Sequence, residues 1–455
     1  MPPSEPSGFH RFLKRWVRVE PSEIGAVVLA FVYFFSLLCT NYILRPIREE
    51  MGIAGGVDNL QWLFTGTFVA MLTLVPLFGW VAARYPRKQF LPYVYYFFLA
   101  NILIFYALFT SDIKHAYVAR AFFIWLSVFN LFVVSVFWSF MADIFSDPQA
   151  KRLFGFIAGG GTIGALTGPV LTASLVGIIG VNNLLLIAAG LLALPVLCIQ
   201  GLARWTKKSG IDRDPQKEAE SDRPMGGSIF AGIPLVLRSP YLLGIGALIL
   251  LYSTLATFLY FEQAALVENA FSEPEQRVAL FAGIDFSTNA ITILVQVFLT
   301  ARIVERLGLA WTLALIPLGV AVGFLVLGLA PVLGVLVVMQ VLRRAGNFSL
   351  TKPAREMLYV VLGKEEKYKA KNFIDTVVYR GGDAVSAWAY TGLRAIGVSL
   401  AGVAFVAVPL AGIWAWVSFR LGRRNAELVA AKRLRFKDHS RGIRHERFTA
   451  RNDKT

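Results

Sequence analysis

Several charged and amide side chains lie inside stretches that are otherwise continuously apolar. Five of them, in the last third of the chain, are Arg343, Arg344, Asn347, Arg380 and Asp383. A charge at the centre of a membrane helix costs about 2.5–3.5 kcal/mol even on the most lenient scale, so such residues pair or face a watery cavity. Arginine binds phosphate or carboxylate groups through two parallel N–H donors. An excess of guanidinium groups over nearby acids therefore predicts a buried site for an anion.

A polar stripe in the apolar segment 278–301 supports this interpretation. Its members recur at helical spacing, so they share one face of a helix, and we expect that face to point into the interior of the helix bundle. They are Asp285, Asn289, Thr292 and Gln296. We predict that the anion is held by Arg343, Arg344, Asn347, Arg380, Lys371, Arg48 and Asn289. The acids predicted to form ion pairs or to couple transport are Asp285, Asp383, Asp375 and Asp143.

The same charges could instead pair with one another along single helices, because residues three or four apart are neighbours on a helix. The candidate pairs are Arg380 with Asp383, Lys371 with Asp375, and Arg48 with Glu49 or Glu50. Such pairing along one helix could explain why any single one of these residues is charged. It does not explain the group as a whole, because arginines outnumber the acids at similar depth in the segments 332–358 and 372–395.

The composition places these residues in a membrane protein. The chain has 455 residues, of which 56% are hydrophobic and only 16% charged, and its mean hydropathy is +0.59. Soluble domains are less apolar, and apolar windows of about 20 residues recur along the whole length. We predict an all-α polytopic membrane protein with twelve spans, at 25–47, 60–82, 90–110, 117–144, 155–178, 183–203, 241–264, 278–301, 310–329, 332–358, 372–395 and 400–420.

A polar segment separates the first six predicted spans from the last six. It reads "RWTKKSGIDRDPQKEAESDRPMGG", with charges of both signs and no periodicity, which is typical of a flexible linker. The predicted organisation is a cytoplasmic N-terminal segment (1–24), a six-helix bundle (25–203), a cytoplasmic linker (204–240), a second six-helix bundle (241–420) and a basic cytoplasmic tail (421–455). Apolar residues at helical spacing favour an interfacial helix within 1–24, and a solvated cap is the alternative.

Lysine and arginine are concentrated on one set of alternate loops and at both ends of the chain. Because positive loops stay on the cytoplasmic side, we expect both termini in the cytoplasm and the protein in the inner membrane. This distribution also accounts for the net charge of +16. The basic tail is therefore interpreted as a topology signal that contacts anionic lipid, with no nucleic-acid partner expected.

No residue pattern predicts catalysis. The four histidines lack metal-ligand spacing, the two cysteines lie in apolar windows, and no nucleophile stands beside a base. Gly159, Gly161 and Gly164 have GxGxxG spacing but follow no strand, so we do not interpret them as a dinucleotide site. With Gly155 and Gly168, Gly164 favours close helix packing instead. We expect no enzymatic activity, cofactor or metal.

Two loops at equivalent places in the two halves resemble a signature of the major facilitator superfamily. They read "GWVAARYPRKQ" and "ARIVERLGLA". The residues predicted to brace the closed cytoplasmic side are Arg84, Arg87, Lys88, Glu305 and Arg306. These charges could also be positive-inside determinants alone. Gly155, Gly164, Gly168 and Pro169 resemble the antiporter signature of this superfamily, and the resemblance implies a monomeric two-bundle transporter that works by exchange.

Three further blocks resemble the bacterial and plastid ATP/ADP translocases. They are "NYILRPIREEMG", "FWSFMADIFSDPQAKRLF" and "PAREMLYVVLGKEEKYKAKNFIDTVVYRGGD". Positions that match charged motifs of that family are Arg48, Glu49, Asp143, Arg355, Glu356, Lys369, Lys371 and Asp375. The resemblance adds Glu356 to the predicted ion-pairing acids. The chain departs from the family pattern at Arg48, where the family has lysine, and at Asp143, where it has glutamate.

The residues and the resemblance together predict a secondary transporter that exchanges an anionic, phosphorylated solute, such as ATP or ADP, by alternating access. Its expected partners are the small anion and the lipid bilayer. One alternative is proton-coupled transport of another organic anion, with Asp285 or Asp383 changing protonation. The other is a non-transporting membrane protein whose basic tail recruits partners.

Overall fold

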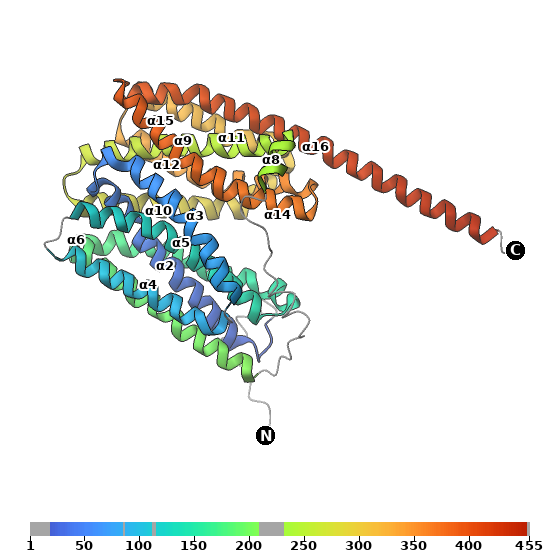
Figure 1. Ribbon diagram of the computed structural model, residues 1–455, viewed down its shortest axis with the longest axis horizontal. Coiled ribbons are helices and arrows are strands. Elements are labelled where there is room, and N and C mark those ends of the chain that lie inside the picture. The colour runs from blue at the N-terminus through green and yellow to red at the C-terminus, as the bar shows by residue number, and fades with distance from the viewer. Residues whose placement is uncertain (1–18, 85–86, 112–114, 209–231, 453–455) are drawn as a thin grey trace. The chain divides into compact units, whose positions relative to one another are not determined.

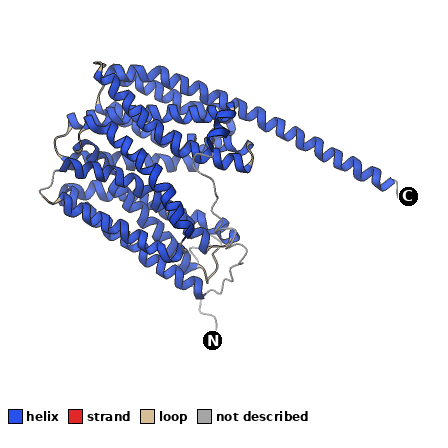
Figure 2. Cartoon of the chain, in the orientation of Figure 1, coloured by secondary structure: helices blue, strands red, loops and turns tan. Residues whose placement is uncertain are grey.

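The computed structural model describes residues 19–84, 87–111, 115–208 and 232–452. Every regular element in these ranges is a helix (Figure 2). Residues 1–18 of the predicted N-terminal segment and 209–231 of the predicted linker lie outside the described residues.

The helices fall into two groups along the chain, before and after residues 209–231 (Figure 1). The first group is α2 (Ile24–Ala54), η1 (Val57–Asn59), α3 (Leu60–Arg84), α4 (Arg87–Phe109), α5 (His115–Ile144) and α6 (Asp147–Lys208). The second group is α8 (Ile233–Arg238), α9 (Pro240–Ala270), α10 (Pro274–Phe298), α11 (Thr300–Leu329), α12 (Leu333–Gly346), η3 (Asn347–Thr351), α13 (Lys352–Leu358), η4 (Tyr359–Val361), α14 (Lys364–Phe373), η5 (Ile374–Val378), α15 (Tyr379–Ala395) and α16 (Leu400–Asn452).

Within the described ranges, nine helices are long and apolar enough to cross a membrane. One of them, α6, contains two predicted spans, because Gly180 breaks the helix with φ 80° and ψ 165°. Two more spans are built from shorter consecutive pieces, α12–η3–α13 and α14–η5–α15. Each predicted span therefore has a helical counterpart, and the predicted all-α membrane fold is confirmed.

The chain forms two compact units. Unit 1 comprises Met1–Gly226 and Tyr260–Ala290, and unit 2 comprises Gly227–Leu259 and Ile291–Thr455. Helices α9 and α10 each contribute to both units, because their adjoining ends belong to unit 1. The division into two sequential bundles at the linker stays a prediction.

In unit 1, α2 packs along α6, with glycines of α6 directly against it. A Cβ atom added at Gly164 would collide with the carbonyl oxygen of Phe35, and one at Gly168 would lie 2.8 Å from the carbonyl oxygen of Cys39. The absence of these side chains allows the two backbones to approach closely. Gly155, predicted to pack in the same way, has open space around it, so that prediction is wrong.

In unit 2, two of the helical segments that carry predicted substrate residues contain a π-helical turn, η3 and η5. Such wide turns are rare, occur frequently at functional sites, and free backbone carbonyl groups. Next to η3, Gln296 Nε2 donates to the Phe348 carbonyl at 3.1 Å, and Thr300 Oγ1 donates to the Ser349 carbonyl at 2.9 Å. Side chains of α10 and α11 thus help to hold the irregular turn in place.

The close approach of α2 and α6 yields a stability prediction. Gly164→Ala should lower the free energy of unfolding by about 1–3 kcal/mol, because the neighbouring atom is backbone and can move only with its helix. The measurement is the melting temperature of purified protein in detergent. Gly190→Ala, in the same helix with nothing near its Cβ position, is the matched control and should not lower it. Equal melting temperatures for the two variants would contradict the packing account.

Candidate functional site

Two tyrosines in unit 2 bring several predicted substrate residues together. The rings of Tyr252 (α9) and Tyr379 (α15) stack with centroids 6.1 Å apart. The guanidinium carbon of Arg343 lies 5.9 Å from the Tyr252 ring centroid, and that of Arg380 lies 5.3 Å from the Tyr379 centroid. Asn347 Nδ2 donates to the Tyr252 hydroxyl at 3.1 Å. Side chains from α12, η3 and α15 therefore meet around one aromatic pair, which we call the tyrosine cluster.

A buried carboxylate, Asp383, holds one arginine of the tyrosine cluster. Its Oδ1 accepts a hydrogen bond from Ser253 at 2.5 Å, and its Oδ2 lies 3.4 Å from Arg380 Nη1. The predicted pairing of Arg380 with Asp383 is confirmed. Arg343 lies against the other ring of the aromatic pair, and Arg344 follows it in the last turn of α12.

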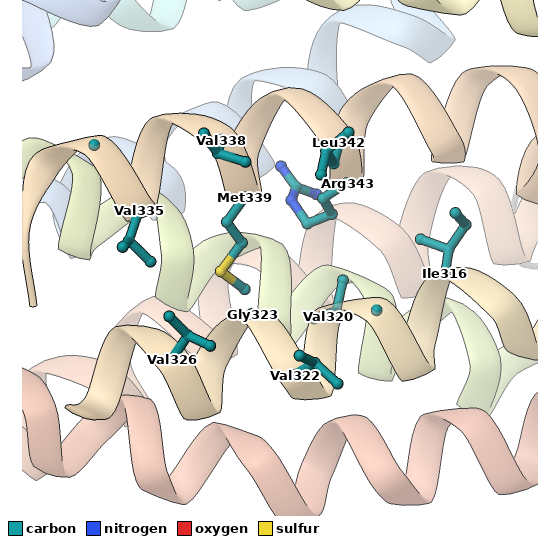
Figure 3. Close-up of a pocket in the computed structure, with 12 residues that line it drawn as sticks. Ile316, Val320, Val322, Gly323, Val326, Val335, Val338, Met339, Leu342 and Arg343 are labelled. Atoms are coloured by element: carbon teal, nitrogen blue, oxygen red, sulfur yellow. The ribbon is translucent and has the colours of Figure 1, made fainter. Parts of the chain in front are cut away.

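The guanidinium group of Arg343 is only partly hydrogen-bonded within the described residues. Its Nη2 donates to Gln340 at 2.8 Å, while Nε and Nη1 are buried and have no hydrogen-bond partner among the described residues. On one side it borders a cavity of about 470 Å³ between α11 and α12, whose other lining residues are all apolar (Figure 3). An apolar cavity cannot compensate a buried charge. The cavity therefore supplies no partner for Arg343, and a partner has to reach it from its polar side, where Gln340 and the tyrosine cluster lie.

A second charged group in unit 2 joins α13 to α14 and η5. Lys371 Nζ lies 2.6 Å from Glu356 Oε2, and Arg355 Nη2 lies 3.3 Å from Asp375 Oδ1. The predicted ion pair of Lys371 with Asp375 is wrong. The wide turn η5 begins between the two residues, so a spacing of four no longer places them on one helical face.

Near the C-terminal end of α2, in unit 1, Arg48 is held on two sides. Its Nη1 lies 3.1 Å from Glu49 Oε1, which confirms the predicted pairing. Its guanidinium carbon lies 3.8 Å from the Phe123 ring centroid, a cation–π contact, and Nε donates to the Phe123 carbonyl at 3.3 Å.

The two buried residues of the predicted polar stripe on α10 contact other helices of unit 1. Arg45 Nε lies 3.6 Å from Asp285 Oδ2. Asn289 Nδ2 donates to the Ala165 carbonyl at 2.7 Å, and its Oδ1 accepts from the Tyr42 hydroxyl at 3.2 Å. These contacts connect α10 to α2 and α6.

The remaining predicted residues belong to other helices than those of the tyrosine cluster. Asp143 is half-buried near the end of α5, Arg84 is exposed at the end of α3, and Glu305 and Arg306 are exposed in the first part of α11. Arg87 and Lys88 begin α4, and their side chains are outside the described part of the structure. Their conformational role stays a prediction.

Sequence reasoning missed three features. Tyr252 carries no charge and so gives no signal inside an apolar window. Glu262, in α9, is completely buried. Glu50 and Arg277 form a two-armed ion pair, with Nε–Oε2 at 2.6 Å and Nη2–Oε1 at 2.7 Å. Both residues lie in polar stretches near the ends of their helices, so neither stands out in the sequence, and helical spacing cannot pair residues so far apart.

The solved structures with similar folds include transporters. The nucleoside transporter NupG superimposes with a TM-score of 0.60 at 13% identity, over 88% of this chain and 98% of that one. A peptide transporter, POT, in complex with sulfate gives a TM-score of 0.58 at 13% identity, over 88% and 95% of the two chains. At these identities the likeness shows the fold alone.

Sequence comparison finds relatives along nearly the whole chain. ADP,ATP carrier protein 1 of Chlamydia trachomatis is 23% identical over 450 residues, covering 90% of this chain and 76% of the relative. ADP,ATP carrier protein 1 of Chlamydia muridarum is 22% identical, covering 90% of each. The family model for the TLC ATP/ADP transporter matches residues 317–424, which include the tyrosine-cluster residues of α12, η3 and α15. The predicted resemblance to ATP/ADP translocases is confirmed.

The model of the Major Facilitator Superfamily matches residues 26–358, most of the chain, and agrees with the loop resemblance found in the sequence. The protein is a multi-pass membrane protein and belongs to the Major Facilitator Superfamily.

Proposed function

We propose that this protein exchanges adenine nucleotides such as ATP and ADP across the membrane by alternating access, and that the tyrosine cluster binds their phosphate groups. The observation that carries the proposal is Arg343, whose Nε and Nη1 are buried with no hydrogen-bond partner among the described residues, on the same aromatic pair as the ion-paired Arg380. The printed names of the relatives, ADP,ATP carriers, support the choice of nucleotide. The protein acts as a transporter and not as an enzyme.

Phosphate binding follows from the donors that the cluster offers. Arg343, Arg344 and Arg380 supply planar pairs of N–H groups that match phosphate oxygens. Asn347 and Tyr252, which are hydrogen-bonded to each other, can orient a bound phosphate group. Asp383 keeps Arg380 in place in the absence of substrate, and an arriving phosphate competes with it for the same donors.

Exchange follows from the electrostatics of the empty site. An uncompensated cluster of cations is costly to enclose in the low dielectric of a bilayer. A nucleotide entering from either side neutralises the cluster and permits the protein to reorient. Unloaded reorientation is then slow, so that uptake of one nucleotide depends on release of another.

The remaining assignments complete the proposal. Lys371, Arg48 and Asn289 assist in substrate binding, and Asp285, Asp375, Asp143 and Glu356 serve in ion pairs. Arg84, Arg87, Lys88, Glu305 and Arg306 brace the closed cytoplasmic side. We place the protein in the inner membrane as a monomer with both termini in the cytoplasm, as the distribution of positive charge suggests.

The proposal predicts that labelled ATP enters proteoliposomes preloaded with ADP, because internal ADP returns the neutralised site to the outer face. Empty vesicles should take up little, and dissipating a pH gradient with a protonophore should leave the exchange unchanged. The measurement is the initial rate of filter-trapped label. Uptake that needs no internal nucleotide and collapses with the pH gradient would favour the proton-coupled alternative.

Arg380→Ala should weaken ATP binding, because it removes charge-assisted hydrogen bonds worth about 1.5–3 kcal/mol, roughly ten- to hundredfold in affinity. The measurement is the ATP concentration that gives half-maximal exchange. Arg424→Gln is the matched control, since Arg424 is an exposed arginine paired with Glu427 on α16 and should behave as the parent protein. Equal half-maximal concentrations for Arg380→Ala and the parent would remove Arg380 from the site.

Asp383→Asn should have the opposite effect on affinity. The amide keeps an acceptor for Ser253 but no longer competes as an anion for Arg380, so the half-maximal ATP concentration should fall several-fold. Release of product, and with it the maximal rate, should become slower. A rise in the half-maximal concentration would show that Asp383 supports substrate binding directly.

A further inference from the structure

Three polar contacts join α2 to α10 within unit 1. From the C-terminal part of α2 inward, they are Glu50 with Arg277, Arg45 with Asp285, and Tyr42 with Asn289. The residue numbers fall on α2 as they rise on α10, so the two helices run antiparallel past one another and the contacts form successive rungs. The rungs extend over about 12 Å of α2, from the helical rise of 1.5 Å per residue.

The first rung is the strongest. Glu50 is 1% exposed, and Arg277 meets it with two donors at 2.6 and 2.7 Å. The remaining donor of Arg277, Nη1, bonds the carbonyl groups of Phe271 and Ser272, which connect α9 to α10. Such a bidentate, buried pair is specific in geometry and strong. Separating it leaves two charges that need water or another partner.

The second and third rungs are weaker. Arg45 and Asp285 approach only to 3.6 Å, and Arg45 is the more exposed of the two. Tyr42 and Asn289 form a neutral hydrogen bond of 3.2 Å. Thr288, beside these rungs on α10, is completely buried.

We infer that these three contacts form a lock that holds one end of the transport pathway closed, and that Glu50 and Arg277 are its principal members. The lock joins the first predicted span to the eighth, and hence residues of the first and second halves of the sequence. Alternating access moves such halves against one another, so contacts of this kind form in one state and break in the other. The role of the lock rests on the proposed transport function, whereas its three contacts are seen in the structure whatever the function.

The lock is tested by the accessibility of a buried reporter. Thr288→Cys is introduced after the buried native thiols, Cys39 and Cys198, have been replaced by alanine. The reaction rate with a soluble maleimide is then measured for protein in nanodiscs without nucleotide. Glu50→Gln and Arg277→Gln should each raise the rate about tenfold, because each favours the open state.

Two further variants separate a lock from a general loss of structure. Exchanging the charges, Glu50→Arg with Arg277→Glu, should return the labelling rate to within about threefold of the parent. Arg277→Lys keeps the charge but loses the paired donors, so its rate should be intermediate, and it serves if Glu50→Gln does not give folded protein. Arg424→Gln, which breaks an equally short but exposed pair, should leave the rate unchanged. Unchanged labelling in the Glu50 and Arg277 variants, or an exchanged pair that labels as fast as the single variants, would overturn the inference.

A second arm connects the lock to transport. Glu50→Cys with Arg277→Cys is bridged by a short, cleavable bifunctional thiol reagent. Bridging should abolish ATP/ADP exchange, and reductive cleavage should restore it. Continued exchange in the bridged protein would show that the lock need not open. If the unbridged parent exchanges no nucleotide, the proposed function fails while the labelling experiment still decides whether the lock exists.

Discussion

The structure depends on how guanidinium groups are accommodated among apolar helices. An arginine in a membrane span must find carboxylates, carbonyl groups, aromatic faces or water. In this protein the first three of these are used: a two-armed carboxylate for Arg277, a carbonyl and a ring face for Arg48, and an acid for Arg380. Arg343 is different, because two of its nitrogens are buried without a hydrogen-bond partner in the described residues. An anionic substrate supplies the acceptors that these two nitrogens lack.

The helices position these charges through local departures from regular structure. The π-helical turns η3 and η5 lie beside the substrate arginines and change which side chains share a face. Glycines on α6 allow α2 to pack closely against it, and α2 carries Arg45, Arg48 and Glu50 toward α10 and α5. At η5 one ion pair that looks local in the sequence, Lys371 with Asp375, is replaced by a contact between helices, Lys371 with Glu356.

Much of the fold could be predicted from the sequence, because span length and apolarity report directly on the thickness of the bilayer. The residues of the tyrosine cluster that carry a charge or an amide, such as Arg343, Asn347 and Arg380, were also predictable, since polar groups in apolar windows are costly and conspicuous. Tyr252, which joins them, was not, because its role depends on an approach of distant helices. The pairing of Glu50 with Arg277 and the effect of η5 on Asp375 depend on tertiary geometry that helical spacing does not encode.

The central claim is that the arginines around the tyrosine cluster require phosphate charge as their partner. It is tested most directly by the thermal stability of the purified protein with ATP and with adenosine, because a ligand that binds only the folded state raises the melting temperature, the more so the further its concentration exceeds its dissociation constant. The account predicts a clear rise with ATP, a smaller rise with ADP and none with adenosine at the same concentration, with the ATP effect reduced in Arg380→Ala. A rise with adenosine equal to that with ATP would contradict it.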